Sequence, residues 1–509
     1  MLFLHDCVRR WASERPFAVA VSAAEAELSY ADLAELVEDG AARLRSAGIR
    51  PGERVVLAGI NTPGWVVAFL AALRCGAVVV PLNSRLGAEQ VPALLADVEP
   101  ALVLADDTQA SVFAAAGLGP RLVSLGAGLP AALDSLPPAP RECPPPDLDA
   151  GSPAILSFTS GTTSAPKGAL ISHGSILAGA KSWLDLLPDG QDALTTVLVP
   201  LFHNTGYVDQ LAHLIVAGGQ VDLVPRFRTD AAVAAMTRRP PTLVVAVPTI
   251  LRMLMLREEA DRIFGACTAA GYGGSPMPVA WAREFADRWP KARLMYGYGL
   301  TEFTSLSHVL DGPEVLEHGD SVGRPVLGAR CEIRDDTGAA VPAGTAGEVW
   351  LAGPQRMLGY WRNPDADAKA LAGEWLRTGD RGVLDEAGRL RLRGRMDDVI
   401  NRGGEKILPA AVEEVLSEDE ALADVAVFGL PDPVLGQRVA VAVVPRPGET
   451  FDPVAARENL GKRLPDYAWP SQFVVLDEMP LAATGKADRR RLAALASGAA
   501  EPSGGGDRG

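Results

Sequence analysis

Short valine-rich runs alternate with helical patterns over the first third of the chain, and this alternation limits the folds open to it. Strand patterns lie at residues 53–60 (ERVVLAGI), 77–82 (AVVVPL) and 101–106 (ALVLAD), and helical patterns at 65–76 and 88–98 separate them. Strands buried on both faces read as continuous apolar runs, and parallel neighbours need a crossover, usually a helix. The order therefore predicts a parallel sheet with helices on both faces.

The same alternation returns at residues 195–256 and predicts a second α/β unit. Residues 321–395 change to short strands broken by turns, the pattern of a small antiparallel or barrel-like unit. After Arg395 a compact pattern of helix, strands, helix and strand begins. Because 509 residues are too many for one core, we predict an α/β protein with more than one domain. The predicted parts are a large N-terminal domain of two α/β subdomains and a small β-barrel-like unit (1–396), a small C-terminal α/β domain (397–495) and a disordered tail (496–509).

Composition narrows the range of partners. The net charge of −15 argues against a nucleic-acid partner, because phosphate backbones favour clustered lysine and arginine. The five cysteines show no CxxC or metal-ligand spacing and are odd in number, which fits a reducing cytoplasm. The six histidines form no HExxH motif or His/Cys cluster, so no zinc site is predicted.

One uncharged stretch, Val55–Leu73, is nearly as long as a membrane span. Residues 61–64 (NTPG) interrupt it, so a strand followed by a buried helix is the better interpretation. The N-terminus lacks the basic start and long apolar run of a signal peptide. We therefore expect a soluble, cytoplasmic protein without a membrane span.

A turn rich in glycine and hydroxyl residues, SFTSGTTSAPKG at 157–168, follows a short apolar run. Backbone N–H groups in such a turn form an anion nest, the hydroxyls add donors, and Lys167 adds a positive charge. The P-loop of kinases and GTPases needs glycine, four residues and then Gly-Lys-Ser/Thr, which this turn lacks. An ordinary polar turn has a similar composition, so the turn alone leaves both interpretations open.

Other segments carry residues suited to a nucleotide. YGYGLTE (296–302) offers a flat tyrosine ring between glycines, and Glu302 is a hard oxygen ligand suited to Mg²⁺ on a polyphosphate. Asp380 and Arg395 are natural partners for ribose hydroxyls. Lys486 lies on a glycine-containing turn, ATGKADRRR. Taken singly, each would more often be a surface carboxylate, an ion pair or a solvated lysine.

Together, the order and spacing of these segments closely resemble the AMP-forming adenylating enzymes, which comprise acyl- and aryl-CoA synthetases, peptide-synthetase adenylation domains and luciferases. The resemblance covers residues 30–495 and is carried by SFTSGTTSAPKG, PLFHNTG, YGYGLTE, GEVWLAGPQRMLGYWRNP, EWLRTGD, GRMDDVINRGGEKI and LAATGKADRR. The stretch INRGGEKILPAAVEEVL looks most like the CoA ligases of that superfamily.

The resemblance implies an ATP-dependent acid–thiol ligase that works in two steps. A carboxylate attacks the α-phosphate of ATP to give acyl-AMP and pyrophosphate, and the thiol of coenzyme A then displaces AMP. Attack of one anion on another needs cations where charge builds up. By resemblance the catalytic residues are Lys486 at the carboxylate and α-phosphate, Thr301 at the α-phosphate, Glu302 on Mg²⁺, and Lys167 on the polyphosphate.

The resemblance also implies binding residues for each part of the substrates. The polyphosphate is lined by Thr159, Ser160, Gly161, Thr162, Thr163 and Lys167. Adenine is surrounded by Gly273, Gly274, Ser275 and Tyr298, and ribose is bound by Asp380 and Arg395. The acyl group lies near His203, Asn204, Gly206, Tyr207, Val247, Gly271 and Tyr272. A mobile C-terminal domain turns about the hinge Asp397 and brings Gly403, Gly404 and Glu405 to the tunnel for the thiol.

The acid is expected to be hydrophobic or bulky and to lack an amine. Asp209 could pair with a substrate amine, as an acidic residue does in peptide-synthetase domains, or it could cap the helix that follows. His203 could be a pocket wall or gate, or a packed core histidine. Two positions depart from the family pattern. Ser164 replaces a glycine, and a positive φ there would be costly for serine; Arg356 replaces an apolar residue.

Three alternatives are weighed against this interpretation. GDSVG at 319–323 matches the GxSxG elbow of α/β-hydrolases, but that elbow needs a strand before it and a helix after, and the flanking residues fit neither. A non-catalytic binding protein is disfavoured because Lys486 and Glu302 are both present. A ligase that loads a stand-alone carrier protein in trans stays open, and no carrier motif follows the C-terminal pattern.

Overall fold

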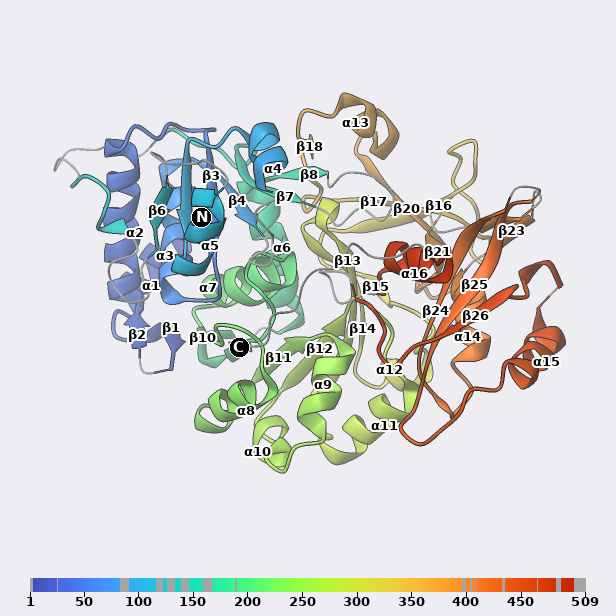
Figure 1. Cartoon of the computed structure of the whole chain (residues 1–509). Helices are drawn as coiled ribbons and strands as arrows, with labels where there is room; N and C mark the ends of the chain where they lie inside the picture. The colour runs from blue at the N-terminus through green and yellow to red at the C-terminus, as the bar shows by residue number, and fades with distance from the viewer. Residues whose placement is uncertain are drawn as a thin grey trace.

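Two large sheets form the centre of the protein, and two smaller sheets follow them along the chain (Figure 1). This computed structural model describes residues 3–24, 26–82, 91–115, 122–125, 133–138, 146–158, 167–187, 190–395, 400–402, 405–407, 409–432, 435–464, 466–481 and 487–498. The arrangement confirms the predicted α/β fold of two α/β subdomains, a small β unit and a small C-terminal α/β unit.

The first sheet has seven strands in the order β18-β8-β7-β4-β3-β5-β6. Its parallel part comprises β3 (Arg54–Ala58), β4 (Val78–Leu82), β5 (Leu102–Ala105), β6 (Leu122–Ser124) and β7 (Pro153–Phe158). β8 (Gly168–Ser172) and β18 (Gly359–Tyr360) extend it in antiparallel fashion. The three strands predicted first are therefore confirmed, and the hairpin β7–β8 flanks the predicted phosphate turn.

The second sheet has nine strands in the order β15-β14-β13-β12-β11-β9-β10-β1-β2. Its parallel strands are β1 (Val19–Ala23), β9 (Leu194–Val197), β10 (Gln220–Leu223), β11 (Leu243–Ala246), β12 (Ala269–Gly273) and β13 (Arg293–Leu300). The antiparallel edges are β2 (Ala26–Ser29), β14 (Ser305–Asp311) and β15 (Arg324–Pro325). Strand β1 pairs with β10, with Val21 opposite Val221, so the N-terminal segment belongs to the second sheet.

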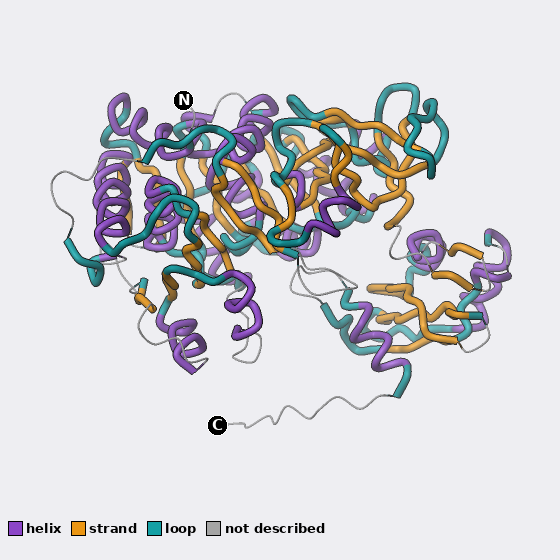
Figure 2. Tube along the Cα trace, turned by 90° about the horizontal axis from the view of Figure 1, so that it is seen from above, coloured by secondary structure: helices purple, strands orange, loops and turns teal. Residues whose placement is uncertain are grey.

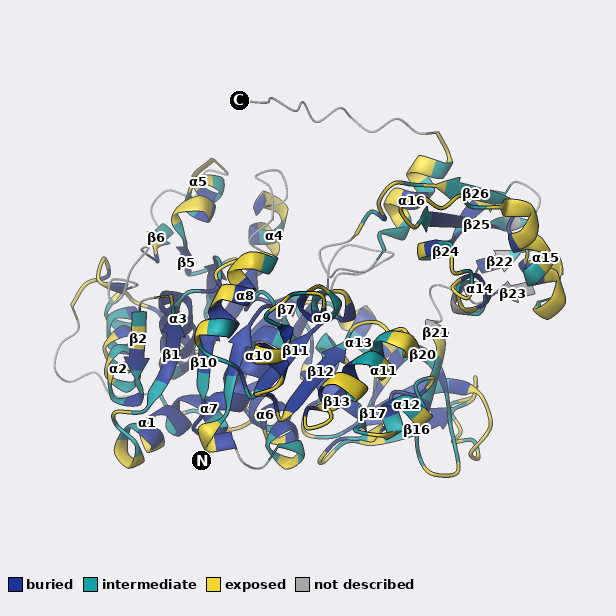
Figure 3. Cartoon of the chain, turned by 90° about the horizontal axis from the view of Figure 1, so that it is seen from below, coloured by how far each residue is buried: buried dark blue, intermediate teal, exposed yellow. Residues whose placement is uncertain are grey.

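Helices cover the faces of both sheets, and their exposed residues form the outer surface (Figure 3). They are α1 (Leu4–Glu14), α2 (Tyr30–Ser46), α3 (Pro63–Cys75), α4 (Val91–Val98), α5 (Asp107–Ala115), α6 (His173–Leu186), the π-helix η3 (Thr205–Ala212), α7 (His213–Ala217), α8 (Thr229–Arg238), α9 (Pro248–Met255), α10 (Ala260–Phe264), α11 (Val279–Arg288) and α12 (Glu314–Glu317). Helix α2 has Ser29 as its N-cap, and the hydroxyl of Ser29 accepts from the N–H of Asp32.

Helix α3 lies in the largest hydrophobic core, which joins residues of both central sheets. All of its residues except Arg74 are buried, because a helix that is apolar on every side can only be stable inside a core or a membrane. This confirms a buried helix within the uncharged stretch Val55–Leu73. Among the described residues, no helix is long and apolar enough to cross a bilayer.

The third sheet is wholly antiparallel and contains β16 (Arg330–Arg334), β17 (Gly347–Ala352), β19 (Leu371–Ala372), β20 (Trp375–Leu384) and β21 (Leu390–Arg395), with α13 (Pro364–Ala370) beside it. The fourth contains β22 (Ile400–Arg402), β23 (Glu405–Ile407), β24 (Leu422–Asp432), β25 (Gly436–Pro445) and β26 (Gln472–Val475), with α14 (Pro409–Leu416), α15 (Pro453–Arg463) and α16 (Arg489–Ala496). Two separate hydrophobic clusters hold the fourth sheet and its helices together, and Figure 2 shows them as a lobe of their own.

Candidate active site

Some of the predicted site residues lie outside the described residues. These are Thr159, Ser160, Gly161, Thr162, Thr163, Ser164, Asp397, Gly403, Gly404 and Lys486. For Arg395 and Glu405 the structure describes the strands that carry them, β21 and β23. The described part of the site therefore comprises Lys167, the segments that follow β12 and β13, strand β20 and the helix η3.

Tyr360 joins two of the predicted catalytic residues. Its hydroxyl donates a 2.8 Å hydrogen bond to Oε1 of Glu302, and the Nζ of Lys167 lies 5.4 Å from the centre of its ring. Strand β18 positions Tyr360 because it pairs with β8, with Tyr360 opposite Ala169. The backbone of Glu302 is held as well, since its carbonyl accepts from the N–H of Met357. The ammonium group of Lys167 and the carboxylate of Glu302, which come from distant segments, therefore both lie next to the phenol of Tyr360.

Asn204 links the end of β7 to the turn that carries Thr301. Its Oδ1 accepts from the hydroxyls of Ser157, at 3.2 Å, and Tyr207. Its Nδ2 lies 3.5 Å from the carbonyl oxygen of Thr301. Tyr207 is fully buried and burial raises its pKa well above the ordinary value. Tyr207 therefore supports Asn204 from the core rather than lining open space.

Tyr298 and Asp380 meet at the opposite side of the site. The hydroxyl of Tyr298, near the end of β13, donates a short hydrogen bond to Oδ2 of Asp380 in β20. The backbone N–H of Asp380 donates to the hydroxyl of Thr378 at 3.0 Å, which fixes the strand beside the carboxylate. Asp380 also stands opposite Arg395 in the register of β20 and β21. The structure thus brings together the residues predicted for adenine and ribose.

The glycines after β12 are required by their surroundings. A Cβ at Gly273 would lie 2.8 Å from the carbonyl oxygen of Gly297, and Gly274 has a φ of +83°. Both conditions exclude most side chains. The exposed Ser275 follows them. Beside this turn the rings of Tyr272 and Tyr296 stack with centres 4.8 Å apart. The stacked rings therefore lie beside the two glycines that are predicted to line adenine.

The predicted acyl residues lie in helix η3 or just before it, at the start of α9 and in β12. Gly206 lies within η3, where a Cβ would be 2.6 Å from the carbonyl oxygen of Pro200. His203 precedes it, with its ring 4.3 Å from that of Phe202. Val247 is half-buried at the start of α9. Gly271 lies in β12, where a Cβ would be 3.2 Å from Cη2 of Trp183. π-Helical segments are rare and often lie at functional sites.

Asp209, also in η3, is buried and bound on both sides by internal donors. The indole N–H of Trp183 donates to its Oδ1 at 2.9 Å, and the hydroxyl of Ser305 donates to its Oδ2 at 2.5 Å. Burial raises the pKa of Asp209 to about 7, although both hydrogen bonds oppose the shift. Because its two oxygens are engaged within the protein, Asp209 is poorly placed to bind a substrate amine or to cap a helix.

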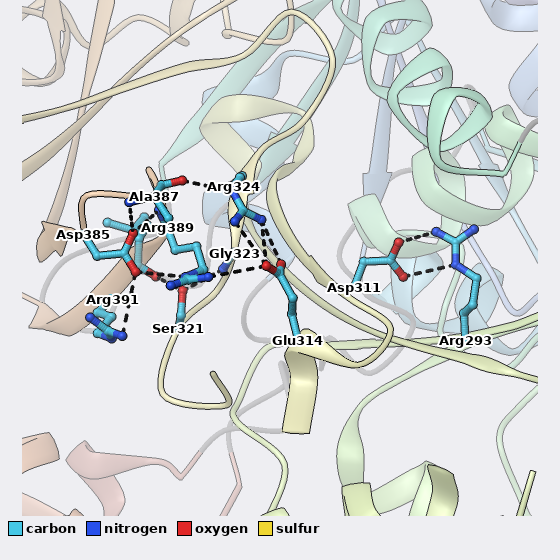
Figure 4. Close-up of polar contacts among 11 residues, drawn as sticks. Arg293, Asp311, Glu314, Ser321, Gly323, Arg324, Asp385, Ala387, Arg389 and Arg391 are labelled. Carbon is cyan, nitrogen blue, oxygen red and sulfur yellow. Dashed lines mark hydrogen bonds and ion pairs between the residues drawn. The ribbon is translucent and has the colours of Figure 1, made fainter. Parts of the chain in front are cut away.

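Ser321 of the GDSVG segment is part of a buried turn (Figure 4). Its hydroxyl donates to the carbonyl of Leu390 at 2.8 Å and accepts from the N–H of Gly323 at 3.0 Å. Beside it, Arg324 and Arg389 both pair with Glu314. The side chain of Ser321 is fully buried. The element that follows is β15, a two-residue strand, whereas the hydrolase elbow needs a helix there. This environment excludes a hydrolase nucleophile at Ser321.

No cluster of three or more His, Cys, Asp or Glu side chains that could hold a metal ion is found among the described residues. Cys7, Cys267 and Cys331 are free thiols. Tyr360 could not be predicted as a site residue from the sequence, although it lies in the motif GYWRNP that carries the family resemblance. Trp183 and Ser305 could not be predicted either, because the sequence offers no local signal for them.

Two family models match most of the chain. The model described as AMP-binding enzyme matches residues 8–361, and the model described as the C-terminal domain of these enzymes matches residues 411–486. The chain belongs to the AMP-binding enzyme family. The resemblance to adenylating enzymes is therefore confirmed.

Other members of the AMP-binding enzyme family match along nearly their whole length. The feruloyl-CoA synthase of an Amycolatopsis species is 34% identical over 485 residues, which are 94% of this chain and 96% of that protein. The indoleacetate–CoA ligase of Aromatoleum aromaticum is 33% identical over 510 residues, 96% and 98% respectively. The structure of o-succinylbenzoate CoA synthetase (MenE) from Bacillus subtilis with its acyl-adenylate has a TM-score of 0.84 at 27% identity and covers 96% and 97%. The chain is an AMP-forming acyl-CoA synthetase.

Proposed function

We propose that this synthetase activates an apolar, bulky carboxylic acid with ATP and Mg²⁺ and transfers the acyl group to coenzyme A. In the first step a carboxylate oxygen attacks the α-phosphorus, the bond to the β-phosphate oxygen breaks, and pyrophosphate leaves. In the second step the thiol sulfur attacks the acyl carbon, AMP leaves with the bridging oxygen, and the thiol proton passes to solvent.

The observation that carries this proposal is the group formed by Lys167, Tyr360 and Glu302. The β- and γ-phosphates would lie beside Lys167, whose charge stabilises the leaving pyrophosphate. Thr301 would contact the α-phosphate, because it lies next to Glu302 in one turn and its carbonyl is near Asn204. Thr159, Ser160, Gly161, Thr162 and Thr163 would line the polyphosphate from the turn between β7 and β8.

The residues present fit a magnesium ion on the triphosphate. Glu302 supplies a carboxylate, the ligand type that Mg²⁺ binds with one or two protein groups and several waters. Tyr360 holds one of its oxygens, so the carboxylate is oriented before a cation arrives. The ion would supply positive charge at the phosphates.

The adenosine would bind where Tyr298 and Asp380 meet. Asp380 and Arg395 would hold the ribose hydroxyls. These hydroxyls would compete with the hydroxyl of Tyr298 for an oxygen of the Asp380 carboxylate. Gly273, Gly274 and Ser275 would line the adenine together with the ring of Tyr298. The lack of side chains on the two glycines leaves room for a flat base against the backbone.

The C-terminal lobe would serve both steps through a rotation. Lys486 would reach the carboxylate and α-phosphate during adenylation, where it offsets the charge of the two anions. Rotation about Asp397 would then remove it and bring Gly403, Gly404 and Glu405 to the tunnel for coenzyme A. The separate hydrophobic clusters of this lobe support movement as a unit.

The acid is proposed to be apolar, bulky and without an amine. Asp209 is bound internally by Trp183 and Ser305, so it is not available as an amine partner. The relatives named for feruloyl-CoA and indoleacetate–CoA formation support an aromatic acid within this class. Gly271 lies close to the tip of the Trp183 ring, where a Cβ would be 3.2 Å from Cη2, and this ring would contact an aromatic group face to face or edge on.

Pyrophosphate release tests the proposal. The enzyme with ATP and Mg²⁺ would be given short, medium and long fatty, aryl, polycyclic and amino acids, each with and without coenzyme A. Lys486→Ala should lose at least a hundredfold in adenylation. Lys462→Ala, an exposed lysine of α15 in the same lobe, is the matched control and should keep full activity.

Each outcome has a meaning. Coenzyme A-dependent turnover with one class of acid supports the proposal and identifies the substrate. Pyrophosphate release without any response to coenzyme A would point to a carrier protein as the acceptor. If no acid is activated, Ser164→Gly tests whether the serine in the phosphate turn is responsible; an inactive S164G enzyme would reject the proposed function.

A further inference from the structure

The carboxylate of Asp209 bridges two parts of the molecule that are far apart in sequence. Oδ1 accepts from Trp183 in α6, 26 residues earlier, and Oδ2 accepts from Ser305 at the start of β14, 96 residues later. All three side chains are buried. A buried carboxylate is costly unless both oxygens are satisfied, so each hydrogen bond depends on the position of the same group.

On one side, Asp209 fixes the indole of Trp183. The ring tip faces Gly271, where a Cβ would be 3.2 Å from Cη2. The ring also stacks on His213, with centres 5.8 Å apart. An indole held at its N–H, packed on one face and facing a glycine has only one orientation. It therefore presents a rigid wall at the place proposed for the acyl group.

On the other side, Asp209 fixes the turn that follows Glu302. Thr304 and Ser305 both have positive φ, 48° and 83°, a conformation that costs free energy in residues other than glycine. Each is held by its own hydroxyl: Thr304 donates to the carbonyl of Gln355 at 2.6 Å, and Ser305 donates to Asp209. The strained turn is thus stabilised by partners outside it.

A second set of hydrogen bonds runs beside the first. The amide of Gln355 donates to the hydroxyl of Ser182 at 3.1 Å and to the carbonyl of Leu327 at 2.8 Å. Ser182 precedes Trp183 in α6, and Gln355 receives the hydroxyl of Thr304. Helix α6 is therefore connected to the turn at two neighbouring positions, through Asp209 and through Gln355.

We propose that Asp209 is a positioning residue that holds the wall of the acid site and the turn after Glu302 as one unit, so that acid selectivity and the adenylation rate depend on the same carboxylate. This inference rests on the proposed function. It assigns to Asp209 no contact with substrate; it acts through Trp183 on the acid and through Ser305 on Glu302.

Three variants separate the two sides. Trp183→Phe keeps a ring but removes the N–H donor, and should change the KM for the acid about tenfold while the KM for ATP stays the same. Ser305→Ala keeps the hydrogen bond between Trp183 and Asp209 and should lower the adenylation kcat about tenfold with little effect on acid selectivity. Asp209→Asn accepts through only one oxygen and should show both defects.

Asp222→Asn is the matched control. Asp222 is also a fully buried aspartate that accepts a serine hydroxyl, from Ser22 at 2.6 Å, but it lies in β10 and its partner lies in β1. It should lower the unfolding temperature without altering either kinetic constant. The double variant W183F/S305A completes a cycle. It should show both defects together, as Asp209→Asn does, and an Asp209→Asn enzyme with unchanged kcat and KM would overturn the proposal.

A measurement without turnover keeps this test apart from that of the proposed function. In protein labelled with 5-fluorotryptophan, the ¹⁹F resonance of Trp183 is assigned by its loss in W183F. Ser305→Ala should shift that resonance, because Asp209 transmits the change, and Asp222→Asn should not. A Trp183 resonance unmoved by Ser305→Ala would refute the positioning role even in an enzyme whose acid is still unknown.

Discussion

The hydroxyl of Tyr360 donates a 2.8 Å hydrogen bond to Oε1 of Glu302, and the same phenol ring lies 5.4 Å from Nζ of Lys167. Three segments that are far apart in the sequence therefore meet at one aromatic side chain. A carboxylate and an ammonium group that share a rigid neighbour keep a fixed separation. Such preorganisation is what stabilisation of a developing charge requires.

Tyr360→Phe should slow adenylation roughly tenfold. The change removes the hydroxyl and keeps the ring beside Lys167, so it isolates the hydrogen bond to Glu302. Loss of one hydrogen bond to a half-buried carboxylate costs about 1–1.5 kcal/mol, which corresponds to that factor. The measurement is kcat/KM for pyrophosphate release over a series of Mg²⁺ concentrations. Tyr467→Phe, in the C-terminal lobe, is the control, and equal losses in both variants would contradict the role given to Tyr360.

Gly271→Ala should discriminate against bulky acids. The new methyl group would lie 3.2 Å from Cη2 of Trp183, and the buried indole has little freedom to retreat. We expect the KM for the largest accepted acid to rise roughly tenfold, the effect of about one misplaced methyl group in an apolar pocket. Small acids should lose less, and the KM for ATP should not change. A uniform loss for all acids would place Gly271 outside the acyl site.

Ser321→Ala should lower stability and leave the reaction intact. The hydroxyl satisfies the buried N–H of Gly323 and the carbonyl of Leu390, so its removal should cost about 1–3 kcal/mol. Calorimetric unfolding measures this cost. A fluorophosphonate probe should leave the wild-type enzyme unlabelled, and covalent labelling of Ser321 would reopen the hydrolase interpretation.

Stability should fall steeply below about pH 6. Burial lowers the pKa of His5 and His308 to about 3 and that of His173 and His213 to about 4. Between these values and the ordinary 6.5, the unfolded chain binds protons that the folded chain does not, so the free energy of unfolding falls as pH falls. Asp209, with its pKa raised to about 7, acts in the opposite direction.

Near pH 5 these groups should make the free energy of unfolding change by about 4 kcal/mol per pH unit. Each group contributes about 1.4 kcal/mol per pH unit, and the four histidines are opposed by one aspartate. Urea unfolding between pH 4.5 and 7 measures this slope. His5→Phe should reduce the slope by about 1.4 kcal/mol per pH unit. A free energy of unfolding that is flat over this range would show that the histidines are accessible to protons in the folded state.

Local patterns in the sequence predict much of the fold because they depend on neighbours along the chain. The serine cap of α2, the buried helix α3 and the three valine-rich strands of the first sheet all follow from residues a few positions apart. The pairing of β1 with β10 does not, since Val21 and Val221 meet only in the folded protein.

The site shows the same division. Glu302, Lys167, Tyr298 and Asp380 could be predicted because each belongs to a recognisable segment. Tyr360 lies in such a segment too, but its role appears only when β18 pairs with β8. The bridge from Trp183 through Asp209 to Ser305 could not be predicted, because it is formed by single residues of three separate segments. The roles of all the predicted site residues, including Lys486, Asp397 and the phosphate turn, remain predictions from the sequence.

The pairing of β1 with β10 also affects how the chain is made. Ser22 and Asp222, which hydrogen-bond across these strands, are separated by 200 residues. At a synthesis rate of about 5–20 residues per second, the first strand waits roughly 10–40 s for its partner to leave the ribosome. During that interval α1, β1 and β2 have no sheet to join, and their apolar side chains are open to other molecules. The N-terminal segment is therefore prone to aggregation during synthesis until β10 has emerged.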